Sequence, residues 1–152
     1  MSRVGKTSGF TLLELLIVLT IVAGVLAVVP LISERSAKNA EIDAAARALV
    51  ADLRWLRQAA IRERHETSLA VDASGARYLR SGDAGFRSLP KGIAIEHKPL
   101  ASVGPQRHAD AIMFYPDGTT SGGELALRST TQSLVVHISW PFGRIETDRR
   151  RG

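Results

Sequence analysis

The pattern of apolar and polar residues divides the chain into two parts. The first part begins with a nearly continuous apolar segment. Residues 10–32 contain one ionisable residue, Glu14. At a rise of about 1.5 Å per residue, a helix of this length can cross a hydrocarbon layer about 30 Å thick. We therefore expect a membrane-spanning helix over residues 10–33, preceded by a short polar leader over residues 1–9.

The helical pattern continues beyond the apolar segment, over residues 34–66. This stretch lacks glycine and proline and is rich in good helix formers. Its apolar residues recur at intervals of four and three and form one stripe: Ile42, Ala46, Leu49, Leu53, Leu56 and Ala60. The stripe either forms a coiled-coil-like seam with another subunit or covers the helix's own domain; a small sheet needs a covering layer, which favours the second. Pro30 lacks a backbone donor, so we expect a kink or local unwinding there.

After residue 66 the period changes to two, which is typical of strands. Residues 67–81 predict a hairpin around the turn Asp72–Gly75. Further strands are expected over residues 93–97, 111–115, 124–129, 133–140 and 144–147. The prediction is an α+β fold: one long helix followed by a small antiparallel β-sheet domain.

The chain carries few of the residue patterns that catalysis or metal binding needs. It has no cysteine, and His65, His97, His108 and His137 are scattered without the spacing of metal ligands. The glycine-rich segment Gly118–Gly123 lacks the lysine of a P-loop and is interpreted as a flexible connection between strands. We expect no enzymatic activity, no cofactor and no metal. Partner contacts are expected at the loops 99–110 and 118–123.

The excess of basic residues is modest. The formal net charge of +5 falls to +3 when Arg3 and Lys6 leave with the leader. The arginine clusters at residues 54–64 and 149–151 are interpreted as a solvated helix face and a frayed C-terminal end. Nucleic-acid binding would be expected to bring more excess charge and interleaved aromatic residues.

Glu14 needs a specific explanation, because a carboxylate inside a bilayer costs about 3 kcal/mol on insertion scales. Cleavage between Gly9 and Phe10 would create a positive α-amino group one helical turn from Glu14, at the positive end of the helix macrodipole. Within one chain or between neighbours, amine and carboxylate can then neutralise each other. An ordinary secretory signal, cleaved at small residues near Ala27, gives Glu14 no role.

The segment G-F-T-L-L-E-L, with Gly9, Phe10 and Glu14, resembles the prepilin signature of type IV pilins and type II secretion pseudopilins. The resemblance implies that a prepilin peptidase cleaves after Gly9 and N-methylates Phe10, and that Glu14 sets the register with a neighbouring subunit. Arg3 and Lys6 favour a cytoplasmic N-terminus. The protein is therefore expected in the bacterial inner membrane, single pass, with its C-terminal domain in the periplasm.

The soluble part carries a second resemblance. The segments R-x-x-A-I-R (57–62), F-Y-P-D-G-T-T-S-G-G-E-L-A-L (114–127) and W-P-F-G-R-I (140–145) are similar to the GspH/FimT-type minor pilin domain. Together the resemblances imply a type IV pilin-like fold with leader 1–9, transmembrane helix 10–33, helix continuation 34–66 and β-sheet domain 67–152. The implied function is that of a minor pseudopilin near the tip of a type II secretion pseudopilus, supporting protein export across the outer membrane.

The resemblance also implies partners: the prepilin peptidase, other minor and major pseudopilins and the inner-membrane secretion platform. The secretin and a secreted substrate are further candidates. The alternative is a FimT-like minor type IV pilin that serves pilus assembly or DNA uptake, whose DNA-binding members carry a basic G-R-x-R tail. Glu146 stands where the second arginine of that tail belongs, which argues against DNA binding. The candidate DNA contacts of this alternative are Arg144, Arg149, Arg150 and Arg151.

Overall fold

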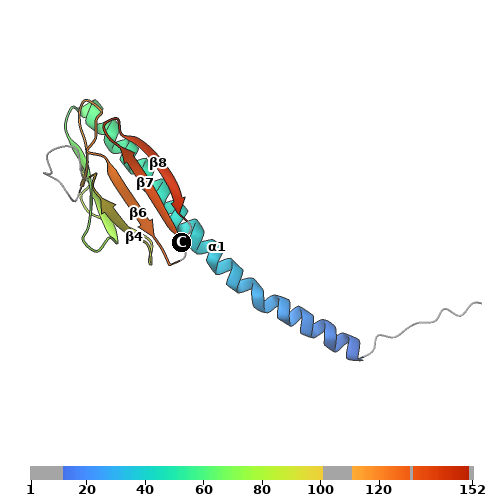
Figure 1. Cartoon of the computed structure of the whole chain (residues 1–152). Helices are drawn as coiled ribbons and strands as arrows, with labels where there is room; N and C mark the ends of the chain where they lie inside the picture. Colours follow the sequence, from blue (N-terminus) through green and yellow to red (C-terminus); the bar gives the residue numbers. More distant parts are fainter. Residues whose placement is uncertain (1–11, 101–110, 131, 151–152) are drawn as a thin grey trace, which may run out of the picture. The chain divides into compact units, whose positions relative to one another are not determined.

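The computed structural model describes residues 12–100, 111–130 and 132–150, without the side chains of residues 26–37 and 150. This part contains one helix, α1 (Leu12–Glu63), and eight strands (Figure 1). The strands are β1 (Thr67–Val71), β2 (Arg77–Arg80), β3 (Arg87–Ser88), β4 (Ala94–Lys98), β5 (Ala111–Phe114), β6 (Gly123–Arg128), β7 (Ser133–Ser139) and β8 (Arg144–Arg150). The predicted α+β fold class is confirmed.

The chain divides into two compact units, Met1–Ala37 and Lys38–Gly152. The second unit contains the C-terminal part of α1 together with every described strand. Helical structure continues through Pro30, so the local unwinding expected there is not observed. A proline removes one backbone hydrogen bond, and the helical turns on either side can tolerate this loss.

In the described part of the chain, no helix is long and apolar enough to cross a membrane. The segment expected to do so, residues 10–33, extends beyond the described side chains at both ends.

The strands form two antiparallel sheets, where the sequence led us to expect one. The first sheet has the order β3-β2-β1-β5 and the second the order β4-β6-β7-β8. The chain passes from the first sheet to the second between β3 and β4, returns between β4 and β5, and passes to the second again between β5 and β6. The sheets also meet at the β1–β2 turn, where the Ile95 amide donates to the Gly75 carbonyl at 2.8 Å. An alternating pattern identifies a strand but not its partner, so this division was not visible in the sequence.

The predicted hairpin around Asp72–Gly75 is confirmed. Val71 pairs with Tyr78, and the Gly75 amide donates to the Asp72 carbonyl at 2.7 Å. Gly75 has a φ of 68°, a left-handed conformation that glycine adopts without steric cost. The turn therefore closes in the way that its residues predict.

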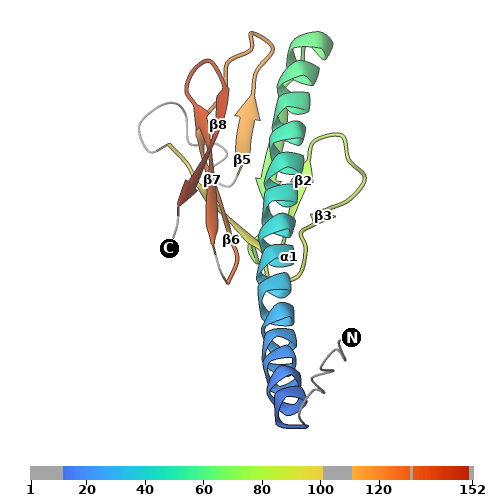
Figure 2. The same cartoon turned by 90° about the vertical axis from the view of Figure 1, so that its right-hand side faces the viewer.

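The apolar stripe of α1 packs against the helix's own domain, as the sequence favoured. Ile42, Leu49, Leu53 and Leu56 are fully buried. They share one hydrophobic cluster with side chains of both sheets, among them Leu69, Ile112, Phe114, Leu125, Leu127 and Val136. Figure 2 shows the C-terminal part of α1 lying along the strands. The helix thus supplies the common core onto which both sheets fold.

The C-terminal end of α1 has two local determinants. Arg64, directly after the helix, has a φ of 54°, the left-handed conformation that commonly ends helices. The Thr67 hydroxyl then donates to the Leu56 carbonyl at 3.0 Å, and Thr67 is 3% exposed. The first residue of β1 is thereby bonded to the last turns of the helix.

Replacing Leu49 by alanine should lower the free energy of unfolding by about 2–5 kcal/mol, because it leaves a cavity where helix and sheets meet. Denaturant unfolding of the full chain in detergent, followed by tryptophan fluorescence, measures this change. Gln58→Ala, at an exposed position of the same helix, is the matched control and should change stability by about 0.5 kcal/mol or less. Equal effects of the two substitutions would contradict the packing described.

Candidate functional site

The N-terminal part of α1 exposes a continuous apolar surface. Ten large apolar side chains of this segment are at least 48% exposed: Leu12, Leu13, Leu15, Leu16, Ile17, Val18, Leu19, Ile21, Val22 and Val25. Soluble monomers rarely expose an apolar patch of this extent. The segment therefore requires an apolar environment, which lipid or neighbouring helices can provide.

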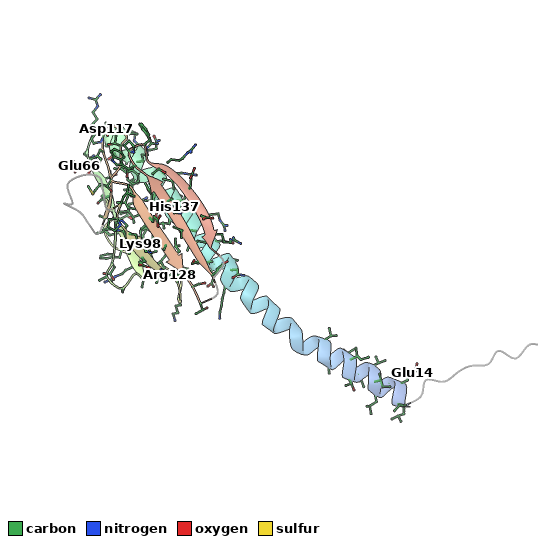
Figure 3. The ribbon with its side chains drawn as sticks, in the orientation of Figure 1. Glu14, Glu66, Lys98, Asp117, Arg128 and His137 are labelled. Carbon is green, nitrogen blue, oxygen red and sulfur yellow. The ribbon has the colours of Figure 1, made fainter. Side chains whose placement is uncertain are left out.

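Glu14 lies within this apolar surface, in the first turn of α1, and is exposed (Figure 3). An acidic side chain is favoured here by the positive end of the helix macrodipole. Gly9 and Phe10, the predicted cleavage and methylation residues, lie outside the described residues. The structure therefore places one of the three predicted processing and assembly residues.

Arg57 brings together the three segments that carried the second resemblance. It belongs to the first of them, 57–62, and its Nε donates to the Gly118 carbonyl in the second at 3.2 Å. A Cβ added to Gly143, in the third, would lie 3.2 Å from the same Nε. Gly118 and Gly143 both have a positive φ, 83° and 63°. One helical arginine thus bonds the β5–β6 turn and lies close to the β7–β8 turn, where glycine at position 143 leaves room for it.

The segment Gly118–Gly123 is not the flexible, exposed connection that its composition suggested. The Thr119 amide and hydroxyl donate to Asp117 Oδ1 at 2.9 and 2.6 Å. The Thr120 hydroxyl donates to the Met113 carbonyl at 2.7 Å, and Thr120 is 1% exposed. Hydrogen bonds from threonine hydroxyl groups therefore hold much of this loop in place. A loop held in this way is a poor surface for contacts with a partner. Most of the other loop expected to contact partners, 99–110, lies outside the described residues.

A buried carboxylate fixes sheet strands to the helix. Asp52 of α1 is 7% exposed and accepts hydrogen bonds from Tyr78 Oη at 2.7 Å, from Arg80 Nη1 at 3.2 Å and from Arg87 Nη1 at 3.2 Å. The Arg80 guanidinium also stacks 3.9 Å from the centroid of the Trp55 ring. Burial, followed by the hydrogen bond to Asp52, raises the pKa of Tyr78, so its hydroxyl remains a donor at neutral pH.

Asp83 extends this network towards the surface. Its carboxylate accepts from Arg80 Nη2 and from Arg87 Nε, each at 2.8 Å. These two bonds lower the pKa of Asp83 below its ordinary value of 3.8. Two carboxylates and two guanidiniums thus join α1 to β2 and β3, where a hydrophobic contact alone would leave the short strand β3 weakly held.

Of the C-terminal arginine cluster 149–151, Arg149 and Arg150 do not belong to the frayed end that the sequence suggested. Strand β8 continues to Arg150, and Arg149 pairs with Leu134 of β7. Arg149 Nη2 binds both carboxylate oxygens of Asp43 on α1, at 2.8 and 3.0 Å. Asp43 lies 106 residues before Arg149 in the sequence, which is why composition alone gave no sign of this contact.

The candidate DNA contacts are partly occupied by acids. Arg144 Nε lies 3.4 Å from Glu146 Oε1, and Arg149 binds Asp43. Arg150 ends β8, and Arg151 lies outside the described residues. The acid that replaces the second arginine of the G-R-x-R pattern is therefore also the partner of the first, which weakens the DNA-binding alternative.

The histidines are not brought together. His137 lies on β7 (Figure 3). Its Nδ1 is 3.1 Å from Oε1 of Glu124, its cross-strand neighbour on β6. His65 lies after α1, His97 on β4, and His108 outside the described residues. Within the described ranges, no group of three or more histidine, cysteine or acidic side chains is arranged to hold a metal ion.

Comparisons with known proteins agree with this geometry. Residues 45–141 match the family described as type II transport protein GspH, and residues 5–29 match the prokaryotic N-terminal methylation motif. One relative is the type II secretion system protein H of Xanthomonas campestris pv. campestris. It is 26% identical over 141 residues, which cover 91% of this chain and 82% of the relative.

Two solved structures show the same fold. The minor pseudopilin EpsH from the type 2 secretion system of Vibrio cholerae matches with a TM-score of 0.55 and 15% identity, over 72% of this chain and 97% of its own. The type IV minor pilin FimU of Pseudomonas aeruginosa matches with a TM-score of 0.54 and 19% identity, over 73% and 90%. The chain therefore has a type IV pilin-like fold.

The family match extends over more than half of the sequence, so the chain belongs to the GspH family of type II transport proteins. This membership confirms the predicted GspH-type minor pseudopilin of type II secretion. The family is one of structural subunits, whose function implies contact with other pseudopilins.

Sequence reasoning missed the Asp52 network, although a signal for it existed. Asp52 follows Ala45 and Leu49 at helical spacing and precedes Leu56 by four residues, so it lies on the stripe that faces the sheets. An acid on a buried stripe requires partners that satisfy its charge. The identities of those partners depend on where β2 and β3 pack, which helical spacing does not determine.

Asp83→Asn should reduce the acid sensitivity of the fold. Because the folded-state pKa of Asp83 lies below 3.8, its carboxylate contributes stability above this value and loses that contribution as the pH falls through the folded-state pKa. Denaturant midpoints of wild type and variant should differ clearly at about pH 5, and the difference should shrink as the pH falls below about 3.8 towards the folded-state pKa. Some slope should remain from Asp72 and Asp117, whose pKa values hydrogen bonds from Ser74 and Thr119 also lower.

The control for this prediction is Glu41→Gln, which removes an exposed carboxylate from α1. Its effect on the midpoint should be small at both pH values. A difference between wild type and Asp83→Asn that stays constant from about pH 5 to about pH 3 would contradict the role assigned to the Arg80 and Arg87 hydrogen bonds.

Proposed function

We propose that this GspH-family chain acts as a membrane-anchored minor pseudopilin that is processed after Gly9 and joins a periplasmic pseudopilus near its tip. The observation that carries the proposal is the exposed apolar surface between Leu12 and Val25, interrupted by Glu14. Lipid covers this surface before assembly and neighbouring helices cover it afterwards. Association within lipid then relies on packing and polar contacts.

The proposed anchor is residues 10–33, inserted once in the bacterial inner membrane. Arg3 and Lys6 keep the leader in the cytoplasm by the positive-inside tendency, so the C-terminal domain lies in the periplasm. The match of residues 5–29 to the N-terminal methylation motif supports this anchor, because the match includes the second half of the leader and most of the apolar segment.

Processing gives Glu14 its role in this proposal. Cleavage by the prepilin peptidase between Gly9 and Phe10 produces a cationic, N-methylated terminus. The Glu14 carboxylate of a neighbouring chain can pair with this cation, which removes two costly charges from the apolar layer together. The pairing sets the register between subunits as they enter the pseudopilus.

The proposed partners follow from the same process. The prepilin peptidase matures the chain, the inner-membrane secretion platform supports assembly, and other minor and major pseudopilins surround α1. At the tip, the secretin and a secreted substrate are the contacts to be expected. The chain acts by assembly in this proposal and not by catalysis, with no cofactor or metal.

The processing step predicts the mature N-terminus directly. Mass spectrometry of the protein from its native membrane should find the first nine residues absent and Phe10 methylated on its amino group. The prepilin peptidase is the cause of both changes, so deleting the peptidase gene should restore the leader. Retention of residues 1–9 in wild-type cells, or a cut near Ala27, would overturn the proposal.

Glu14→Ala should leave membrane insertion intact and reduce co-purification with other pseudopilins roughly tenfold, because a polar contact in a membrane is worth about 1–2 kcal/mol. The measurement compares membrane fractions with the yield of affinity-purified complexes. Thr20→Ala is the matched control: its hydroxyl bonds the Leu16 carbonyl of the same helix at 2.7 Å, and its loss should change neither quantity. Unchanged co-purification of the Glu14 variant would refute the assembly role.

A further inference from the structure

A groove lies between α1 and the edge strand β8. The face of α1 that carries Arg47, Ala51 and Arg54 forms one wall, and the alternate residues Thr147 and Arg149 of β8 form the other. Its main cavity has a volume of about 610 Å³. A second cavity of about 340 Å³ shares Arg54 and continues towards the β7–β8 turn. We name this feature the α1–β8 groove.

The groove has an apolar floor and basic walls. Ala46 and Leu134 are 4% and 3% exposed, and Val50 is half-buried beside them. Arg47 and Arg54 stand above this floor, exposed and seven residues apart, or about 10 Å along a helix. Among the described residues, neither of them has an ion-pair partner. The surface of α1 therefore presents two aligned guanidiniums that the domain does not use.

The groove already binds one carboxylate of the chain itself. Asp43, which also lines the main cavity, is bound through both oxygens by Arg149 Nη2 at 2.8 and 3.0 Å. This contact shows the geometry in which a guanidinium of the groove binds an acidic side chain. Arg47 and Arg54 offer the same chemistry to an acid from outside.

The second wall offers main-chain groups. Strand β8 pairs with β7 on one side, and in the described part of the chain no strand pairs with its other side. An open strand edge can bind an extended peptide through backbone hydrogen bonds. Side chains of that peptide can then reach the apolar floor and the arginines of α1.

We propose that the α1–β8 groove binds an extended acidic segment of a neighbouring pseudopilin. Its carboxylates bind Arg47 and Arg54, and an apolar side chain between them contacts Val50 and Leu134. This inference rests on the proposed assembly function and adds to it a surface on the globular domain, separate from the apolar surface around Glu14.

Nucleic acid fits the groove less well than an acidic peptide. No aromatic side chain is among the described residues that line the two cavities, so bases have no stacking partner there. The Asp43 carboxylate would repel phosphate groups, and the apolar floor would lie beneath a charged backbone. A peptide can satisfy both the arginines and the floor.

The test places a photo-cross-linking amino acid at Ala51, an exposed position in the groove wall, of the full-length chain in the native bacterium. Mass spectrometry of the cross-linked product should identify another pseudopilin, joined at a segment with at least two Asp or Glu residues. Arg47→Gln/Arg54→Gln should lower the cross-link yield roughly tenfold, because charge-assisted hydrogen bonds are lost. The product should also decrease when solubilised complexes are irradiated at raised salt.

The matched control is Arg62→Gln/Arg64→Gln, which removes two charges outside the groove, one in the last turn of α1 and one directly after it. It should leave the yield within about twofold of wild type. All four arginines are exposed, so neither variant should disturb the fold. Unfolding temperatures of both variants are compared with wild type to check this. Should the groove variant be unstable, the segment cross-linked by the otherwise wild-type chain still decides the assignment.

Several outcomes would overturn the groove assignment and leave the proposed function standing. These are a cross-link to nucleic acid, to a second copy of this chain or to a segment without acidic residues, or no cross-link while other pseudopilins still co-purify. Failure of any pseudopilin to co-purify with the wild-type chain would instead refute the proposed function, and the groove assignment with it.

Discussion

The burial of one stripe of α1 against two sheets is the interaction on which the domain depends. Leu49, Leu53 and Leu56 are fully buried and belong to the same cluster as Leu69 of the first sheet and Leu125 of the second. Neither small sheet has a core of its own without this helix, because a sheet of a few short strands needs a covering layer. The compact unit accordingly begins at Lys38, within the helix, and not at the first strand.

Polar groups specify how the sheets attach to this core. Apolar packing is non-directional and would allow β2 and β3 to shift along the helix. Asp52 accepts hydrogen bonds from Tyr78, Arg80 and Arg87, which together define one position for these strands. Arg57 of α1 donates a hydrogen bond to Gly118 in the β5–β6 turn and lies close to Gly143 in the β7–β8 turn. Hydrophobic burial thus provides the stability, and two polar junctions provide the unique arrangement.

Much of this architecture could be predicted from local pattern. The helical stripe, the Asp72–Gly75 hairpin and most strands follow from periodicity and turn residues, which act over a few positions. Three features could not be predicted in this way: the division into two sheets, the extension of β8 to Arg150 and the hydrogen bonds that hold Gly118–Gly123. Each depends on a partner distant in sequence, such as Asp43 for Arg149 or Met113 for Thr120. The motif around Gly9 and Glu14 was informative for the opposite reason, because its chemistry is contained in six residues.

The surfaces of α1 differ along its length in the environment that each requires. Around Glu14 the helix is apolar on its exposed surface, so it requires lipid or other helices. Further along, one stripe is used by the chain's own sheets, and the exposed face beside it carries Arg47 and Arg54 next to the open edge of β8. Association of the apolar helix surface within lipid relies on packing and a few polar contacts. Charged groups at the margin of an apolar surface exclude wrong partners more effectively. A subunit with a particular place in an assembly therefore needs a second, more selective surface, and the α1–β8 groove has the charge and the open strand edge to provide one.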